Sequence, residues 1–75
     1  MASLPVLSGG DTVKVFGRFG WSVARQTSSH IIMTKEAEIA SLSIPNHKAV
    51  ARGTLRSLIR SANLTVDEFV SRLKK

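Results

Sequence analysis

Histidine is the side chain whose ordinary pKa lies close enough to neutrality for it both to accept and to donate a proton. The chain has two, His30 and His47. His30 ends a polar segment, residues 25–30, that lies between two apolar runs at residues 21–24 and 31–33. A polar segment between strand-like runs predicts a hairpin connection, which places His30 at a sheet edge near solvent. His30 is therefore the first candidate for acid–base chemistry, and the competing interpretation is a surface histidine without a chemical role.

His47 follows Pro45 in a segment whose composition is typical of a turn. We expect the His47 side chain to hydrogen-bond the loop rather than to react. The chain has no cysteine, and it offers no cluster of Asp and Glu from which zinc or paired magnesium ions could take three or four ligands. Gly9-Gly10 lacks the lysine and hydroxyl spacing of a phosphate-binding P-loop. Neither a metal nor another cofactor is expected.

The charge of the chain favours an anionic partner. Eleven Lys and Arg against five Asp and Glu give a formal net charge of +6. A net positive charge attracts polyanions and speeds their encounter with the protein. One helix face carries an arginine at every fourth residue, namely Arg52, Arg56 and Arg60, and like charges at that spacing repel. Such a row indicates either contact with an anion or a basic face exposed to solvent. An acidic protein is an alternative partner. With one Trp, three Phe and no Tyr, contact with a nucleic acid is expected mainly at its backbone.

A chain of 75 residues forms one small domain, residues 1–75, that buries only about 60% of its unfolded surface. A large internal substrate cavity is therefore not expected, and any chemistry takes place on an open face. No apolar run approaches the roughly 20 residues that span a bilayer. We expect a cytoplasmic protein that does not contact a membrane.

Alternating and apolar sequence patterns predict the strands that must position His30. Residues 21–26 alternate as a strand with one buried face, and Ala40, Leu42 and Ile44 share a face of another. Short connections favour an antiparallel three-stranded meander. The expected strands cover residues 21–26, 30–34 and 38–44, with a turn at 35–37 and a stop at Pro45.

Helices are expected before and after these strands. Ser8 and Asp11 have the spacing of a weak capping box for a helix over residues 9–19, and Gly20 suits the left-handed residue after it. A second helix opens at Gly53 with an apolar stripe, and Asn63 tolerates left-handed geometry after it. The segment 65–68 forms a full capping box for a short last helix that ends in Lys74-Lys75. Residues 1–7 are expected to be extended or frayed.

This order predicts an α+β fold, α-β-β-β-α, with helices on one face of the sheet and a short C-terminal helix. Double-stranded-RNA-binding domains share that topology, but topology alone assigns no activity.

Several short motifs, in their order and spacing, resemble those of the HicA (YcfA-like) toxin family of toxin–antitoxin systems. The resemblance covers residues 8–69. The motifs are Gly20-Trp21, Arg25-Gln26, Ser29-His30, Ile44-Pro45 with His47, and Gly53-Thr54-Leu55 with Ile59.

The resemblance implies a small ribonuclease that cuts messenger RNA, arrests translation and is neutralised by a HicB-type antitoxin. It places the catalytic histidine at His30. The family commonly has glycine where this chain has Ser28, a change that could stiffen the turn or shift His30 relative to RNA. The family also often carries more lysines where this chain has residues 48–52, which implies weaker RNA contact there.

RNA supplies its own nucleophile, the 2′-hydroxyl, so a protein needs little more than an acid–base group and cations. We expect His30 to act without a metal, either as the base toward the 2′-hydroxyl or as the acid toward the leaving 5′-oxygen. Arg25 would hold the phosphate through two hydrogen bonds, and Gln26 or Ser29 would orient the imidazole. The expected RNA-binding residues are Arg25, Gln26, Ser29, Lys48, Arg52, Arg56 and Arg60.

Two further expectations concern partners. A HicB-type antitoxin would cover the His30 face and offer acidic groups to the arginine face. The alternative to an enzyme is a non-catalytic double-stranded-RNA-binding module, in which His30 hydrogen-bonds a sugar hydroxyl.

Overall fold

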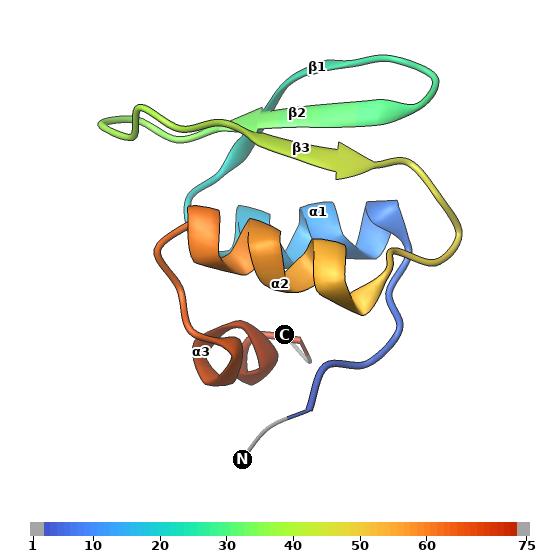
Figure 1. The fold of residues 1–75 in the computed structure, drawn as a ribbon. Helices are drawn as coiled ribbons and strands as arrows, with labels where there is room; N and C mark the ends of the chain where they lie inside the picture. Colours follow the sequence, from blue (N-terminus) through green and yellow to red (C-terminus); the bar gives the residue numbers. More distant parts are fainter. Residues whose placement is uncertain (1–2, 74–75) are drawn as a thin grey trace.

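The computed structural model describes residues 3–73 and has the expected α+β architecture. A three-stranded sheet forms one layer, α1 and α2 both pack against one face of it, and α3 packs below α2 (Figure 1). The elements are α1 (Gly9–Gly17), β1 (Ser22–Gln26), β2 (His30–Thr34), β3 (Leu42–Pro45), α2 (Arg52–Ser61) and α3 (Val66–Ser71). The predicted double-stranded-RNA-binding-domain-like order is confirmed.

The sheet is the predicted antiparallel meander, in the order β1-β2-β3. β2 begins at His30 and ends at Thr34, as predicted. Its residues Ile31 and Met33 are buried, as are their β3 partners Ile44 and Leu42. The face that these four side chains share therefore packs against the helices.

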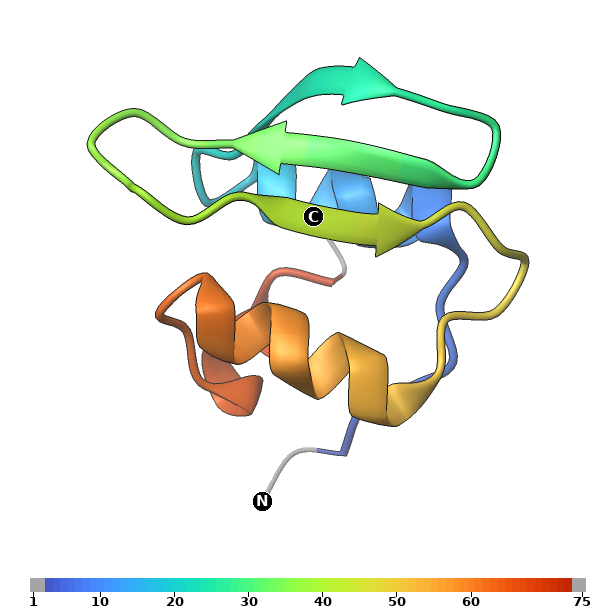
Figure 2. The same ribbon diagram turned by 45° about the horizontal axis from the view of Figure 1, so that its top comes forward.

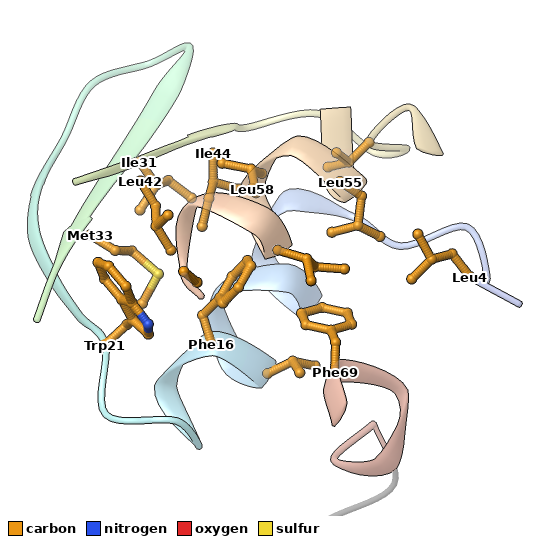
Figure 3. Close-up of a cluster of buried hydrophobic side chains, with 14 residues drawn as sticks. Leu4, Phe16, Trp21, Ile31, Met33, Leu42, Ile44, Leu55, Leu58 and Phe69 are labelled. Carbon is orange, nitrogen blue, oxygen red and sulfur yellow. The ribbon is translucent and has the colours of Figure 1, made fainter. Parts of the chain in front are cut away.

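The core lies between the sheet and the helices (Figure 3). Phe16 of α1 and Phe69 of α3 are both fully buried, with ring centroids 5.1 Å apart. Trp21 is also buried and precedes β1, so it fixes the start of the first strand against the core.

The predicted strand at residues 21–26 is confirmed over Ser22–Gln26, but the prediction that one face of it is buried is wrong. All five residues of β1 are exposed, and only Trp21 before it is buried. β1 is an edge strand, and a β-bulge breaks its alternation: Val23 lies opposite Met33 and Arg25 opposite Ile32, which leaves Ala24 as an extra residue.

The third strand is shorter than predicted. β3 begins at Leu42 instead of residue 38, Ala40 is exposed, and Pro45 is its last residue rather than a stop beyond it. Ala37 takes a positive φ of 72° in the turn after β2. Glu38 then accepts a hydrogen bond from the Asn63 side chain at 3.5 Å, so the loop contacts the turn after α2 before it reaches β3.

The helix caps follow the local sequence. The Ser8 hydroxyl accepts from the Asp11 amide at 3.0 Å, although α1 ends at Gly17 rather than residue 19. Gly20 has the predicted left-handed conformation, with φ 98°, and so does Asn63, with φ 61°. The capping box of α3 is confirmed.

Gly9 is required by a close approach of the backbone. A Cβ atom at this position would clash with the Pro45 carbonyl oxygen, and the Gly9 amide donates to the His47 carbonyl at 2.8 Å. The first turn of α1 therefore packs directly on the segment after β3.

The apolar stripe of α2 is buried as predicted, and the helix begins at Arg52, one residue earlier than expected. Residues 3–7 are extended but not frayed. Leu4 is 3% exposed, and the Val50 amide donates to the Leu7 carbonyl at 2.7 Å. The predicted cationic end at Lys74-Lys75 lies outside the described residues.

Candidate functional site

The turn before His30 is fixed by a threonine side chain. The Thr27 hydroxyl accepts from the His30 amide at 3.0 Å and from the Ser29 amide at 3.4 Å. The Thr27 amide in turn donates to the His30 carbonyl at 2.8 Å. The hairpin is therefore closed by the Thr27–His30 pair, with Ser28 and Ser29 at its tip.

Thr27 was not among the predicted site residues. The signal for it is a hydroxyl residue three positions before the histidine in a turn, because such side chains hydrogen-bond nearby backbone amides.

The neighbouring strand β3 holds His30 from the other side. His30 lies opposite Pro45 in the ladder, and the Asn46 amide donates to the Ser29 carbonyl at 2.9 Å. This bond is a regular rung of the antiparallel ladder, and Pro45 lies at a position of the edge strand β3 whose amide would face away from β2, so the ladder loses no bond to the proline. The backbone around His30 is thus bound on both sides, while its side chain is exposed.

The imidazole itself is oriented by Ser29. The Ser29 Oγ and His30 Nδ1 atoms lie 3.1 Å apart. When Nδ1 carries the proton, it donates to the hydroxyl and Nε2 presents a lone pair; when it does not, the hydroxyl donates and Nε2 carries the proton. Nε2 makes no hydrogen bond within residues 3–73 in either case, so it is available to a substrate as base or acid.

The side of the sheet away from the helices, here called the open face, carries His30. Since Ile31 and Met33 point into the core, alternation along β2 places His30, Ile32 and Thr34 on the open face. No helix crosses this face (Figure 2). With the partners of these residues in the ladder, the open face consists of Ser22, Arg25, His30, Ile32, Thr34, Ser43 and Pro45.

Arg25 shares the open face with His30 because of the bulge. Arg25 pairs with Ile32, two residues after His30 on β2, so it is a diagonal neighbour of His30. Diagonal neighbours lie roughly 7–8 Å apart, within reach of a long side chain. An arginine there can direct two parallel N–H donors at a phosphate next to the imidazole.

Gln26 lies on the other side of the sheet. It pairs with Ile31, whose side chain is buried beneath the sheet, so the structure does not place Gln26 where it could orient the imidazole. Of the two residues predicted for that task, the structure brings Ser29 to the ring.

The predicted phosphate-binding residues outside the sheet fall into two groups. Lys48 is exposed in the loop between β3 and α2, and that loop, the hairpin tip and the first turns of α1 and α2 lie at one end of the molecule (Figure 1). Arg52 donates from Nε to the Leu4 carbonyl at 2.9 Å, so its guanidinium holds the N-terminal segment. Arg56 and Arg60 are exposed farther along α2, in the helical layer.

His47 contributes to the fold through its main chain. Its carbonyl caps the Gly9 amide, whereas its exposed imidazole makes no hydrogen bond within residues 3–73. The expectation that the His47 side chain would hydrogen-bond the loop is therefore wrong within residues 3–73. Among the described residues, no group of three or more His, Asp or Glu side chains could hold a metal ion.

A cavity of about 250 Å³ lies on the helical side of the molecule. It is lined by Leu7, Asp11, Lys14, Val15, Arg18 and Leu73. None of these residues belongs to the sheet, so the cavity is separate from His30, whose surroundings are an open surface.

Together these features define a small basic protein with a double-stranded-RNA-binding-domain-like α+β fold and a histidine–arginine pair on its open sheet face. The sequence model described as the HicA toxin of bacterial toxin–antitoxin systems matches residues 9–64, and the chain belongs to this family. The matched range includes β1 to β3 and α2, and ends before α3. A search of curated proteins gave no match.

Family membership makes the protein the toxin of a toxin–antitoxin system, with an antitoxin as its partner. None of the helices within residues 3–73 has the length and apolar character needed to cross a membrane.

Proposed function

We propose that this toxin is a metal-independent endoribonuclease that cleaves messenger RNA at His30. The observation that carries the proposal is the pairing of an oriented, exposed imidazole with an arginine on one open face. The family supplies the toxin role, and the chemistry of RNA supplies a nucleophile that needs only a base and a cation.

The reaction requires two proton movements. Nε2 of His30 accepts the proton of a ribose 2′-hydroxyl, and that oxygen attacks the adjacent phosphorus. The bond from phosphorus to the 5′-oxygen breaks, and the 5′-oxygen takes a proton either from the imidazolium or from water. The products carry a 2′,3′-cyclic phosphate and a 5′-hydroxyl.

Arg25 stabilises the charge that develops on the phosphate oxygens. Its planar guanidinium can bind two of these oxygens at once, and its interaction strengthens as negative charge grows in the transition state. Lys48, at the same end of the molecule, holds the RNA backbone farther from the reacting phosphate. Arg56 and Arg60 act at longer range, by steering the RNA through the net charge of +6.

The antitoxin partner in this proposal is a HicB-type protein that covers the open face. Covering His30 blocks RNA directly, and an acidic partner complements a chain with eleven basic and five acidic residues.

The test is to incubate the purified protein with end-labelled messenger RNA in the presence of a chelator and to analyse the fragment ends. Cleavage that leaves 2′,3′-cyclic phosphates supports the proposal, provided that His30→Ala abolishes it. His47→Ala is the matched control, because the exposed His47 ring makes no hydrogen bond within residues 3–73, and it should cleave like the native protein. Binding without cleavage by the native protein would indicate an RNA-binding module instead, and cleavage that requires a metal ion would contradict the mechanism.

A further inference from the structure

The open face has a composition suited to an extended nucleic acid strand. The segments SVARQ, HIIMT and LSIP of β1, β2 and β3 contain no acidic residue. Its side chains are arranged in cross-strand rows: His30 beside Pro45, then Arg25, Ile32 and Ser43, and then Ser22 with Thr34. An imidazole, a guanidinium, hydroxyls and a half-buried apolar residue thus form one continuous surface.

We propose that RNA binds this face as a single strand, which crosses from His30 past Arg25 and Ile32 to Ser43 on β3. Ser43 is then an RNA-contacting residue. The inference rests on the proposed ribonuclease function and adds to it the path and the strandedness of the substrate.

The reaction geometry favours a single strand. In-line displacement needs the 2′-oxygen, the phosphorus and the leaving 5′-oxygen in a row. The regular backbone of an A-form duplex keeps the 2′-oxygen beside the phosphate instead of opposite the 5′-oxygen. A flexible strand lying on a surface can rotate into line, and no walled cavity next to His30 is needed to bend it.

The dimensions and side chains fit the same conclusion. Strands lie about 4.8 Å apart, so the face is roughly 10 Å across from β1 to β3, a width for one extended strand. Ile32, half-buried between Arg25 and Ser43, offers an apolar support for a base, and the Ser43 hydroxyl can bond a sugar or phosphate oxygen. Because the three strands contain no Phe, Tyr or Trp, stacking is limited and sequence preference should be weak.

The arginines of α2 do not lie on this path. Arg52 is bound to the Leu4 carbonyl, and the segment that carries Leu4 runs below the helices, on the side away from the sheet (Figure 1). Arg56 and Arg60 follow Arg52 at four-residue intervals along the same helix. A short RNA on the open face therefore cannot contact this arginine row at the same time.

Two matched substitutions separate the two surfaces. Ser43→Asp places a carboxylate on the open face, and Ser57→Asp places one on α2, beside Arg56 and one turn before Arg60. Both serines are exposed.

Each substitution is made in the His30→Ala protein, so that RNA is not cut. Binding to a fluorescein-labelled single-stranded RNA dodecamer is then measured by fluorescence anisotropy. We expect Ser43→Asp to weaken binding by about 10-fold or more, as for loss of a nearby phosphate contact, and Ser57→Asp to change it by less than about 3-fold through screened long-range charge.

The reverse result, a large loss with Ser57→Asp and none with Ser43→Asp, would overturn the proposed path and place the RNA on the helices. Equal affinity for a hairpin duplex and for the single strand would overturn the strandedness. If the native protein still cuts RNA in either case, the ribonuclease proposal survives alone; if no form of the protein binds or cuts RNA, both proposals fail.

Thermal unfolding of each variant excludes a folding defect as the cause. Should Ser43→Asp not fold, Thr34→Asp repeats the test on β2, because Thr34 is exposed on the same face. Ser43→Thr keeps the hydroxyl and should bind like the parent.

Discussion

Arg25 lies diagonally across from His30 on the open face of the sheet only because a bulge at Ala24 shifts it there. Val23 pairs with Met33, which is buried beneath the sheet, and strict alternation would send Arg25 to that same side. The extra residue moves Arg25 into register with Ile32 and therefore onto the face of His30. An irregular feature of the edge strand thus assembles the pair on which the proposed chemistry depends.

Replacing Arg25 should impair cleavage without affecting the fold. In Arg25→Ala the developing phosphate charge loses its nearest cation, and we expect the cleavage rate to fall about 10²–10³-fold, as for the loss of one transition-state donor. Stability should be unchanged because Arg25 is exposed on an edge strand. Single-turnover cleavage and thermal unfolding measure the two effects.

Arg25→Lys is the control for geometry. It keeps the charge but cannot form two parallel hydrogen bonds, so it should recover only part of the lost rate. A rate for Arg25→Ala equal to that of the native protein would remove Arg25 from the site.

Thr27 should act as a positioning residue for His30. Thr27→Ala removes the acceptor of the His30 and Ser29 amides, and we expect the free energy of unfolding to fall by about 1 kcal/mol. The larger effect should be on kcat, lowered about 10-fold or more with little change in KM, because a small displacement of the imidazole disrupts the alignment for attack.

Thr27→Ser retains the hydroxyl and should restore kcat. If the serine variant is as slow as the alanine variant, the hydroxyl bond is not what positions His30.

Local signals in the sequence were sufficient for much of the fold. The caps at Ser8 and Thr65, the left-handed Asn63 and the limits of β2 follow from residues within a few positions of each other. The same holds for His30 at the start of β2, which needed only a turn between two apolar runs.

The predictions that failed concern features that depend on pairing between distant segments. The sequence pattern of residues 21–26 alternates, but the register of β1 against β2 sets a bulge in the strand. This bulge exchanges the sheet faces on which Arg25 and Gln26 lie. Likewise, nothing near Arg52 indicates that its guanidinium binds the Leu4 carbonyl, 48 residues away. The predicted arginine row does lie along one helix, and its role in binding RNA phosphates stays a prediction.

Arg52 and Arg56 should therefore differ in their contributions to stability. Arg52→Ala breaks the partly buried bond to Leu4 and loosens the N-terminal segment, and we expect the free energy of unfolding to fall by about 1–1.5 kcal/mol. Arg56→Ala, on the same helix and without such a bond to any described residue, should change it by less than about 0.5 kcal/mol. Urea unfolding of both proteins makes the comparison, and equal effects would show that the Arg52 bond does not stabilise the fold.

The contact between α1 and the segment after β3 links helix packing to the site. In Gly9→Ala the new methyl group would meet the Pro45 carbonyl oxygen, which is backbone and cannot rotate away. We expect a loss of about 1–3 kcal/mol from this overpacking. Because Pro45 is the ladder partner of His30, the displacement should also lower the cleavage rate.

Gly10→Ala is the matched control, because its methyl group would lie 3.9 Å from the Ser8 hydroxyl oxygen, an ordinary contact. Its stability should stay the same or rise by up to about 1 kcal/mol, because alanine favours the helix. Thermal unfolding and cleavage are measured on both variants. If Gly9→Ala proves as stable and as active as Gly10→Ala, the position of α1 does not determine the position of Pro45 and His30.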